Sequence, residues 1–369
     1  MKLLALTNNM RERDGWGRYA ASVAREYTEQ CPDFEVLTEE TQGKEHRELH
    51  ERAVLLSLRS QLNFFRNCLR ARRAAHSADV VHAFDGWPYS VYGYAAVLGT
   101  SKKLFTTGVG TYSVAPFENF WQKMLMARAY RRAQNIFCVS RYTRERILEK
   151  ISLKNTSIVP WGPKILPELT SEEKARYRTH FKIGNHNPVI LTVGQIKQRK
   201  GQYDTVRAVA RLRERYPNLL YLMVGSDSDT EYVGTIQTFV DERGLKDAVR
   251  IINNAESDSE LSFFYDLCDI FVMNSRNDGE HFEGFGLVFL EAMQFGKPTV
   301  GSSGCGIEDA IRDGYNGYLA SQGNDKEMYD AFMKVLDGDG KLLAHNAQEM
   351  YTQFSWKKTV AEYVRNYHL

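Results

Sequence analysis

The chain of 369 residues alternates short apolar runs with longer helical segments along nearly its whole length. In the first half the apolar runs are "KLLALT", "FEVLT", "DVVHAF", "KKLFTTG", "NIFCVS" and "TSIVP"; in the second half they are "VILTVG", "LYLMVG", "VRIIN", "DIFVMNS" and "PTVGSS". Continuous runs of this kind are typical of strands buried on both faces of a parallel sheet, with a helix between successive strands. The alternation therefore predicts an α/β protein built from βαβ units.

The alternation pauses once, between Pro160 and Pro188, in a proline-rich stretch with a charged helical segment in its middle. A chain of this length can form two domains that each bury a core of their own. We therefore expect two doubly wound domains, one over residues 1–165 and one over residues 166–350, joined near the pause. Ligands of such sheets bind beyond the carboxyl ends of the strands, so the loops that follow the strands are the candidate site.

Composition and charge narrow the classes of protein further. The chain is 43% hydrophobic and 25% charged, and its net charge of +2 gives no general argument for binding nucleic acid. The five cysteines are far apart with no CxxC pair, which favours reduced thiols over a zinc site. The first residues are apolar too briefly for a secretory leader and no apolar run of roughly eighteen residues occurs, so we expect neither a cleaved leader nor a membrane-spanning helix. We therefore expect a cytoplasmic protein.

The segment "EGFGLVFLE" places two acids, Glu283 and Glu291, around a glycine-containing helix start. Glycine lets backbone amides approach a ligand closely, and a helix beginning near Phe285 would point its unpaired N–H groups at an anion such as phosphate. Glu283 would lie at the mouth of this site and Glu291 about a turn and a half inside. Hydroxyl groups on both sides of a diphosphate describe a nucleotide sugar, although two acids on a solvated helix face remain an alternative.

A second loop, "VGQIKQRKGQ", follows a predicted buried strand and carries Lys197, Arg199 and Lys200. Cations at this place can neutralise the charge that grows on a departing nucleotide diphosphate, as a metal ion does in other enzymes. A solvated basic turn is the alternative. The acidic "DSD" at 227–229 is interpreted as a turn or helix start rather than a metal site, so no metal is expected.

The stretch "EGFGLVFLEAMQFGKPTVGSSGCGIEDAIRDGYNGYL" resembles the signature of the retaining glycosyltransferases of family 4, which have the GT-B fold of two Rossmann-like domains facing a cleft. The resemblance continues through "ILTVGQIKQRKG", "YLMVGSDSD", "YDLCDIFVMNS" and "FSWKK". It covers the first half only in layout, through "DGWGRYA", "DVVHAFDGW" and "IFCVSRYT". It implies an acceptor-side N-terminal domain, a nucleotide-sugar-binding C-terminal domain, and a helix over 351–369 that crosses back to the N-terminal domain.

The resemblance also implies roles for single positions. Glu283 would bind the transferred sugar, and Lys200 would neutralise the diphosphate; these two are the predicted catalytic residues. Glu291 would bind the ribose of the donor. The further donor contacts implied by matching positions are Phe285, Gly286, Leu287, Gly15, Gly17, Gln195, Arg199 and Asn253.

Two positions depart from the family pattern. Gln195 stands where the family usually has an arginine, and Val109 stands where a histidine is common. A non-catalytic sugar-nucleotide-binding protein, or another GT-B enzyme such as an epimerase or phosphorylase, therefore stays open beside the transferase. An NAD(P)-dependent oxidoreductase is disfavoured, because "TNNMRERDGWGRYA" after the first strand lacks the third glycine of G-x-G-x-x-G.

On the acceptor side, the candidates are His82 and Asp85 in "VVHAFDGW" and Thr111 in "TTGVGTYS". A structural role for the histidine is equally open. We expect a retaining, metal-independent hexosyltransferase that uses a UDP-sugar or GDP-mannose. Its hydroxyl acceptor would be a saccharide or a lipid-linked molecule, in the synthesis of a cell-surface glycan or glycolipid.

The segment 47–75 has apolar residues at helical spacing, which predicts a helix packed on the core. Four arginines recur in it at every seventh position, which predicts a single stripe on that helix: Arg52, Arg59, Arg66 and Arg73. The stripe is interpreted as a solvated face or as a contact with anionic lipid or a phosphorylated acceptor. The aromatic and basic segment 117–134 supports a peripheral contact with the inner face of a membrane.

Overall fold

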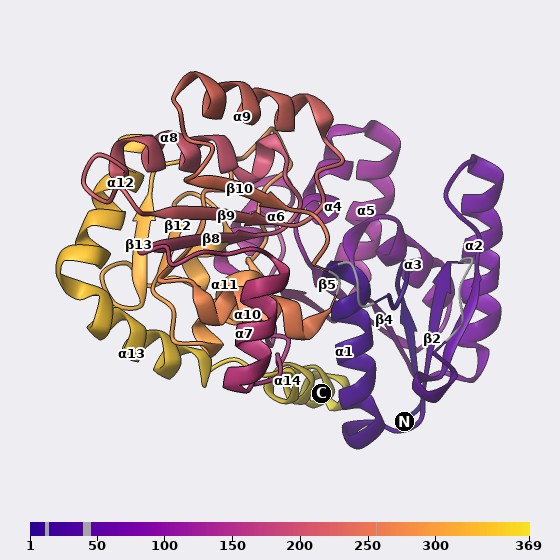
Figure 1. Cartoon of the computed structure of the whole chain (residues 1–369). Helices are drawn as coiled ribbons and strands as arrows, with labels where there is room; N and C mark the ends of the chain where they lie inside the picture. Colours follow the sequence, from indigo (N-terminus) through magenta and orange to yellow (C-terminus); the bar gives the residue numbers. More distant parts are fainter. Residues whose placement is uncertain (12–14, 40–45, 256) are drawn as a thin grey trace. The chain divides into compact units, whose positions relative to one another are not determined.

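The computed structural model of the chain describes residues 1–11, 15–39, 46–255 and 257–369 (Figure 1). These residues form two compact units. Unit 1 consists of Met1–Gly162 together with Ser355–Leu369, and unit 2 consists of Pro163–Phe354. Unit 1 is therefore made of two stretches of sequence that are separated by the whole of unit 2.

Unit 1 contains a parallel sheet, seven-stranded within the described residues. Its strands are β1 (Leu3–Leu6), β2 (Phe34–Glu39), β3 (Glu51–Leu55), β4 (Val80–Ala83), β5 (Lys103–Gly108), β6 (Asn135–Cys138) and β7 (Thr156–Ile158). They lie in the order β3-β2-β1-β4-β5-β6-β7, which is the strand order of a dinucleotide-binding Rossmann sheet with one strand added. In the register, Leu3 pairs with Phe34 on one side and Val80 on the other.

Helices cover both faces of this sheet. They are α1 (Gly15–Gln30), α2 (Gln61–Ala74), α3 (Val91–Val97), α4 (Thr111–Val114), α5 (Phe120–Arg132), α6 (Arg141–Lys150) and α14 (Trp356–His368). Helices α1 and α14 pack together on one face, and α2, α3 and α5 form a layer on the other (Figure 1). Polar side chains mark several helix starts: the Ser60 hydroxyl accepts from the backbone of Asn63 at α2, and Asn119 caps α5.

Unit 2 repeats the same plan with a sheet that is six-stranded in the part of the chain described. Its strands are β8 (Val189–Val193), β9 (Leu220–Val224), β10 (Val249–Ile252), β11 (Ile270–Met273), β12 (Thr299–Ser302) and β13 (Gly317–Ala320). All neighbours are parallel in the order β10-β9-β8-β11-β12-β13. Counted from the first strand of the unit, this is the order of the first six strands of unit 1.

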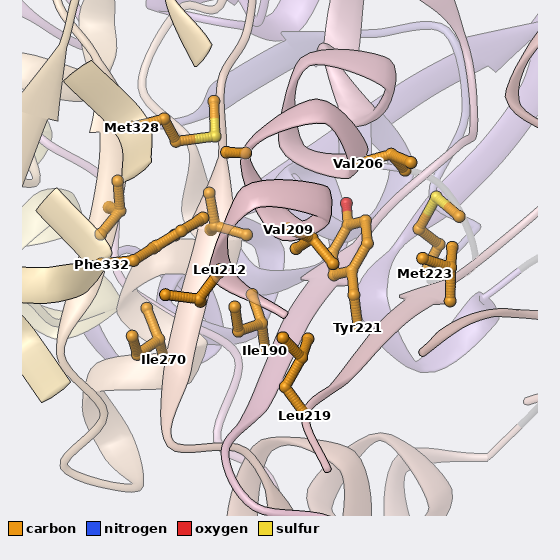
Figure 2. Packing of buried hydrophobic residues seen from close by; sticks show 14 of the residues in the cluster. Ile190, Val206, Val209, Leu212, Leu219, Tyr221, Met223, Ile270, Met328 and Phe332 are labelled. Atoms are coloured by element: carbon orange, nitrogen blue, oxygen red, sulfur yellow. The ribbon is translucent and has the colours of Figure 1, made fainter. Parts of the chain in front are cut away.

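The helices of unit 2 form two layers around the sheet. They are α7 (Ser171–His180), α8 (Gln202–Leu212), α9 (Thr230–Glu242), α10 (Asp258–Leu267), α11 (Leu287–Gln294), α12 (Asp325–Lys334) and α13 (Gly340–Tyr351). Helices α8, α9 and α12 lie on one face, and α7, α10, α11 and α13 on the other (Figure 1). Figure 2 shows the core between α8, α12 and the sheet, where Val209 and Leu212 meet Tyr221 and Phe332, all fully buried.

The expectation of two doubly wound parallel sheets is confirmed, and every strand expected from an apolar run is present. Two further strands, β3 and β13, were not expected. Both lie at an edge of their sheet and are only partly buried, because one side of an edge strand lacks a neighbour. Their sequences, "ERAVL" and "GYLA", consequently lack the continuous apolar character of a central strand.

The expected helix over 47–75 is wrong in its first half. Arg52 lies in β3, Arg59 lies in the turn after that strand, and α2 begins only at Gln61. The four arginines therefore do not form one stripe on one helix. The expected core packing is also wrong, because Leu62, Phe65 and Leu69 of α2 are exposed.

Helix α14 is part of the core of unit 1, although it lies at the far end of the sequence. The hydroxyl oxygen of Tyr367 lies 2.5 Å from that of Tyr27 in α1 and 2.6 Å from Nδ1 of His82 in β4. Tyr363 and Tyr367 are both fully buried. The C-terminal helix thus completes the fold of the N-terminal unit. No helix among the described residues combines the length and apolar character needed to cross a bilayer.

Candidate functional site

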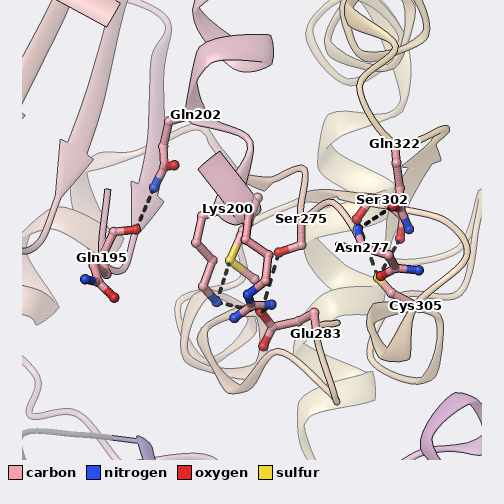
Figure 3. A network of polar contacts seen from close by, with 11 residues as sticks. Gln195, Lys200, Gln202, Ser275, Asn277, Glu283, Ser302, Cys305 and Gln322 are labelled. Carbon is pink, nitrogen blue, oxygen red and sulfur yellow. Dashed lines mark hydrogen bonds and ion pairs between the residues drawn. The ribbon is translucent and has the colours of Figure 1, made fainter. Parts of the chain in front are cut away.

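A charged cluster lies at the carboxyl edge of the unit 2 sheet, where the loops after β8 and β11 meet (Figure 3). Nζ of Lys200 donates to Oε2 of Glu283 over 2.6 Å, and Nη1 of Arg199 lies 3.3 Å from the same oxygen. The hydroxyl of Ser275, two residues after β11, lies 3.5 Å from the same oxygen. The sequence places Lys200 and Glu283 more than eighty residues apart, and the fold brings them into contact.

The carboxylate of Glu283 is held in its ionised form. Burial alone would raise the pKa of Glu283, but the adjacent Lys200 and Arg199 outweigh burial and lower it to about 2. Glu283 is therefore a permanent anion and a hydrogen-bond acceptor at every physiological pH.

The loop after β8 nevertheless carries more positive than negative charge. Burial lowers the pKa of Lys197, and the neighbouring Arg199 and Lys200 lower it further. Glu283 and Asp229 act in the opposite direction but do not cancel the effect of burial and of the two neighbouring cations. An anionic ligand bound beside Lys200 would relieve the repulsion between these cations, which makes this edge a favourable place for a diphosphate.

Neighbouring residues fix the position of the cationic loop. The backbone carbonyl of Arg199 accepts from the backbone amide of Arg276 over 2.8 Å, and the Arg276 guanidinium pairs with the buried Asp204 of α8 at 2.7 and 2.5 Å. At the other end of the loop, Nε2 of Gln202 donates to the carbonyl of Gln195 over 3.0 Å (Figure 3). The side chain of Gln195 points elsewhere and donates to Ser228 over 3.3 Å.

Helix α11 begins at Leu287, two residues later than the sequence suggested. Gly286 caps the helix with a φ of 84°, a left-handed conformation that favours glycine. Phe285 is buried, with its ring 5.7 Å from that of Phe354, so only its backbone is offered to a ligand. The first amides of α11 follow directly from the segment that carries Glu283.

The loop after β12 supports the same segment from behind. The backbone amide of Gly306 donates to the carbonyl of Glu283 over 2.8 Å. A Cβ atom at Gly306 would lie 1.9 Å from the carbonyl oxygen of Gly284, so no other residue fits there without displacing the backbone. Gly306 thus holds the turn that presents Glu283.

Glu291 lies inside α11 and is only 1% exposed. The hydroxyl of Tyr265 in α10 donates to its Oε2 over 2.8 Å. The structure therefore separates the two acids of the motif: Glu283 faces cations, whereas Glu291 is held in the interior by a tyrosine.

Asn253 follows β10 at the same edge of the sheet. Its Nδ2 donates over 2.7 Å to Asp227, which follows β9. Asp229 accepts from the backbone of Tyr232 and caps α9, as the interpretation of "DSD" as a helix start predicts. In the described part of the chain, no three His, Cys, Asp or Glu side chains are grouped to hold a metal ion.

Unit 1 brings its own candidates to the carboxyl edge of its sheet. Asp85 follows β4 and Thr111 opens α4 after β5. Oδ1 of Asp85 accepts from the backbone amide of Gly86 over 2.6 Å and lies 3.3 Å from the Ser113 hydroxyl. Burial raises the pKa of Asp85 to about 7, although the bonds from Gly86 and Ser113 lower it. Its Oδ2 is buried with no partner among the described residues.

His82 is not an acceptor contact. It is fully buried on β4, with Nε2 2.9 Å from the Thr107 hydroxyl and Nδ1 beside the hydroxyls of Tyr27 and Tyr367. Burial lowers its pKa to about 3, so the ring is neutral. Neither ring nitrogen contacts Asp85. The expectation is corrected because His82 lies within the strand, where its side chain enters the core.

Gly15 and Gly17 lie in the first turn of α1, and Gly17 is buried. Residues 12–14 of the same loop lie outside the described residues. The ring of Trp16, between the two glycines, lies 4.9 Å from that of Tyr112. This contact joins the start of α1 to the Thr111 loop at one edge of the sheet.

Several residues of these sites were not predicted. Ser275 is the last residue of the strand run "DIFVMNS", and its place just beyond a central strand is the signal that could have indicated it. Gly306 lies in the unusual "GSSGCG" stretch, whose glycines suggest close backbone approach. Tyr265 gives no such signal, because it is one aromatic residue among several in α10.

Family profiles match both units of the chain. The profile described as "Glycosyltransferase Family 4" matches residues 13–163, and the profile described as "Glycosyl transferases group 1" matches residues 173–353. The chain belongs to glycosyltransferase family 4. The resemblance found in the sequence is thereby confirmed.

Family 4 members of known name align with part of the chain. It is 31% identical over 185 residues to the D-inositol 3-phosphate glycosyltransferase of Corynebacterium urealyticum, covering 48% of this chain and 42% of that protein. It is 28% identical over 207 residues to the GDP-mannose-dependent alpha-(1-6)-phosphatidylinositol monomannoside mannosyltransferase of Mycolicibacterium smegmatis, covering 53% of each. The chain thus spans about half the length of these relatives.

A solved structure extends the likeness to the whole fold. Anabaena HepE, crystallised in complex with UDP and glucose, matches with a TM-score of 0.80 at 19% identity, over 99% of this chain and 98% of that one. At this identity the likeness establishes the fold, which is GT-B.

Proposed function

We propose that this family 4 chain is a retaining hexosyltransferase that moves a sugar from a nucleotide-sugar donor to a hydroxyl acceptor without a metal ion. The observation that carries the proposal is the contact of Lys200 and Arg199 with Glu283 beside the start of α11. Cations and helix amides at one strand edge suit a diphosphate, and a fixed carboxylate among them suits sugar hydroxyls.

The proposed donor roles follow from this geometry. Lys200 and Arg199 neutralise the diphosphate, while the amides of Phe285, Gly286 and Leu287 donate to it or to the sugar. Glu283 accepts from hydroxyls of the transferred sugar. Because two cations already contact its carboxylate, a bound sugar would share it with them rather than replace them.

The nucleoside side is proposed from the remaining positions. Glu291 would accept from the ribose, with Tyr265 holding its carboxylate in place. Asn253 and its backbone would lie beside the base, and Gln195 beside the phosphates. Gly15 and Gly17 would let the start of α1 approach the donor. The donor is a UDP-sugar or GDP-mannose; the complex of HepE with UDP and the GDP-mannose dependence of the mycobacterial relative support these two choices.

The proposed chemistry needs no nucleophile from the protein. The bond between the anomeric carbon and the diphosphate oxygen breaks, and the acceptor oxygen bonds to the same face of that carbon. The leaving phosphate oxygen takes the proton of the acceptor hydroxyl. The protein contributes placement and electrostatic stabilisation of the departing anion, which is the task that Lys200 and Arg199 suit.

The acceptor is proposed to be a saccharide or a lipid-linked molecule, in the synthesis of a cell-surface glycan or glycolipid by a cytoplasmic enzyme. The relatives named for inositol phosphate and for a phosphatidylinositol mannoside support a polar hydroxylated acceptor. Asp85 and Thr111 are the proposed acceptor contacts, because both lie at the carboxyl edge of unit 1.

A sugar-nucleotide-binding protein without transfer activity is the second candidate, since Gln195 replaces a cation of the family pattern; an epimerase or phosphorylase is the third. A thermal-shift panel of UDP- and GDP-sugars identifies the donor, because a ligand that binds the folded state raises its apparent stability. Incubation of that donor with saccharide and lipid acceptors, in the presence of a chelator, is then expected to give product with retained anomeric configuration. Binding without turnover would favour the second candidate, and an inverted product would refute the retaining mechanism.

A further inference from the structure

Unit 1 exposes a group of large apolar side chains on the described part of its surface. On α2 these are Leu62, Phe65 and Leu69, with exposed fractions of 56%, 63% and 56%. At the start of α5, Phe120 and Trp121 are 67% and 69% exposed. Soluble proteins rarely expose so many large apolar residues in one region, and such regions mark interaction surfaces.

The orientation of α2 is fixed, so this exposure is a property of the fold. Asn67 is fully buried, and its side chain both accepts from and donates to the backbone of Leu56, each over 2.8 Å. It also donates to the hydroxyl of Tyr92 in α3 over 3.1 Å. With Asn67 and Ala71 turned inward, the residues at 62, 65 and 69 must point away from the sheet.

A hollow of about 750 Å³ joins the two exposed groups into one surface. Phe64 and Trp87 form part of its lining, with their rings stacked 5.3 Å apart. Phe65 and Trp121 line it as well, so α2 and α5 contribute to the same depression. We call Leu58, Leu62, Phe65, Leu69, Phe120, Trp121 and this hollow the α2–α5 surface.

Positive charge predominates around the α2–α5 surface, because Glu118 beside Phe120 is already paired with Lys150 over 2.7 Å. Residues 52–78 contain six arginines and no Asp or Glu, and α5 contains Lys123 and three arginines and no acid. Arg59 and Arg66 are exposed and form no ion pair with the described part of the chain. A protein partner would have to be both acidic and apolar, whereas a bilayer with anionic headgroups offers both properties at one boundary.

We propose that the α2–α5 surface docks on an anionic lipid bilayer. Leu62, Phe65, Phe120 and Trp121 enter the interfacial region, where aromatic rings are favoured, while Arg59 and Arg66 contact headgroup phosphates. The hollow between the helices receives apolar lipid segments. The inference deepens the proposed function, since it places a lipid-linked acceptor at unit 1, but it requires neither donor nor turnover.

Vesicle flotation of the full chain tests the proposal without donor or acceptor. Vesicles of phosphatidylcholine alone are compared with vesicles containing about one third phosphatidylglycerol. The wild type should bind the anionic vesicles and bind the neutral ones far less. Failure to bind anionic vesicles, or equal binding to both kinds of vesicle, overturns the membrane proposal even if the chain transfers sugar normally. Vesicle binding without sugar transfer would instead contradict the proposed function and leave the membrane proposal standing.

Substitutions separate the contribution of the apolar side chains from that of the arginines. Phe65→Ser with Trp121→Ser should weaken partitioning at least about tenfold, because two large apolar side chains no longer enter the interface. Arg59→Gln and Arg66→Gln should each weaken binding to anionic vesicles about fivefold and leave neutral vesicles unaffected. Leu342→Ser, an equally exposed apolar residue of α13 in unit 2, is the matched control and should change nothing.

Two further readouts exclude other occupants. The fluorescence of Trp121 is the difference between the emission of wild type and that of Trp121→Phe. It should shift to shorter wavelength when anionic vesicles are added, because the indole leaves water. In sedimentation experiments without lipid, wild type and Phe65→Ser should show the same association state. A lipid-independent dimer that depends on Phe65 would instead assign the surface to a second copy of the chain and overturn the membrane proposal.

Discussion

Each unit places a carboxylate with little exposure after the fourth strand of its sheet, and the two carboxylates are in opposite charge states. Asp85 follows β4, the fourth strand of unit 1, and Glu283 lies in the loop after β11, the fourth strand of unit 2. Glu283 faces two cations and has a pKa of about 2; Asp85 faces an amide and a hydroxyl and has a pKa raised to about 7 by burial. Both acids follow the fourth strand of their sheet, so the shared strand order explains their similar positions. The groups that contact each carboxylate determine whether it is ionised.

The difference suggests a division of labour. The unit 2 edge is built around permanent charges that suit a diphosphate, and the unit 1 edge around a carboxyl that is half protonated near neutral pH. Removing charge at the unit 2 edge should therefore affect donor chemistry, whereas removing the carboxyl at the unit 1 edge should affect stability and acceptor use.

The largest expected effect is that of Lys200→Ala. Loss of one donor to a developing oxyanion costs about 2.7–4 kcal/mol, so kcat should fall about 10²–10³-fold. Steady-state transfer with the identified donor measures this. Lys246→Ala removes a lysine from an exposed surface pair with Asp241 and should leave kcat unchanged. A kcat of Lys200→Ala close to that of the control would remove the basis for assigning the cluster to catalysis.

Glu283→Gln should lower kcat at least about tenfold, because a neutral amide accepts less strongly from the sugar hydroxyls. The same variant should keep or increase its affinity for the free nucleoside diphosphate, because the cations of the loop lose their counter-charge. Isothermal titration with UDP or GDP measures the second effect. Loss of nucleotide affinity would mean that Glu283 holds the cations in place rather than contacting the sugar.

The two carboxylates should also respond to pH in opposite directions. For Asp85 the pKa rises from 3.8 to about 7 on folding, so wild type should lose stability relative to Asp85→Asn as pH rises across that interval. For Glu283 the pKa falls from 4.5 to about 2, so wild type should lose stability relative to Glu283→Gln as pH falls across that interval. Denaturant unfolding should detect about 1 kcal/mol or more for Asp85. A pH-independent difference between wild type and Asp85→Asn would show that the pKa of this carboxyl is the same in the folded and unfolded states.

The smallest effect concerns the support of the cationic loop. Gln202→Ala removes the hydrogen bond to the Gln195 carbonyl and should cost about 1 kcal/mol of stability. It should lower kcat/KM by a few-fold while nucleotide affinity falls in parallel, because the loop is less well placed. Gln198→Ala, an exposed residue of the same loop, is the control. Equal behaviour of the two variants would argue against a positioning role for Gln202.

The sequence predicts the central strands of both sheets because their burial on two faces leaves continuous apolar runs. It does not predict β3 and β13, since edge strands are half covered and carry polar residues such as Glu51 and Arg52. Helical spacing in α2 correctly indicates an apolar face, but periodicity does not say what covers it. That question is decided by Asn67, whose contact with Leu56 depends on where the chain turns after β3.

The candidate site also has features that the sequence predicts and features that it does not. Loop positions after strands locate Lys200 and Glu283 at one edge, because the carboxyl ends of parallel strands meet there. The surroundings of Glu283 also depend on groups from other loops, the hydroxyl of Ser275 and the backbone amide of Gly306, and these loops meet only in the complete fold. His82 shows the limit of the argument, because a polar residue near a strand end can equally belong to the interior.

The tyrosines of α14 have a consequence for how the protein is made. Unit 1 needs Tyr363 and Tyr367 to complete the interior around Tyr27 and His82, yet these residues leave the ribosome after all of unit 2. Unit 2 is one continuous stretch and can fold first during synthesis, although it is second in sequence. The nascent N-terminal half must therefore wait, with part of its apolar interior uncovered, until α14 has also been synthesised.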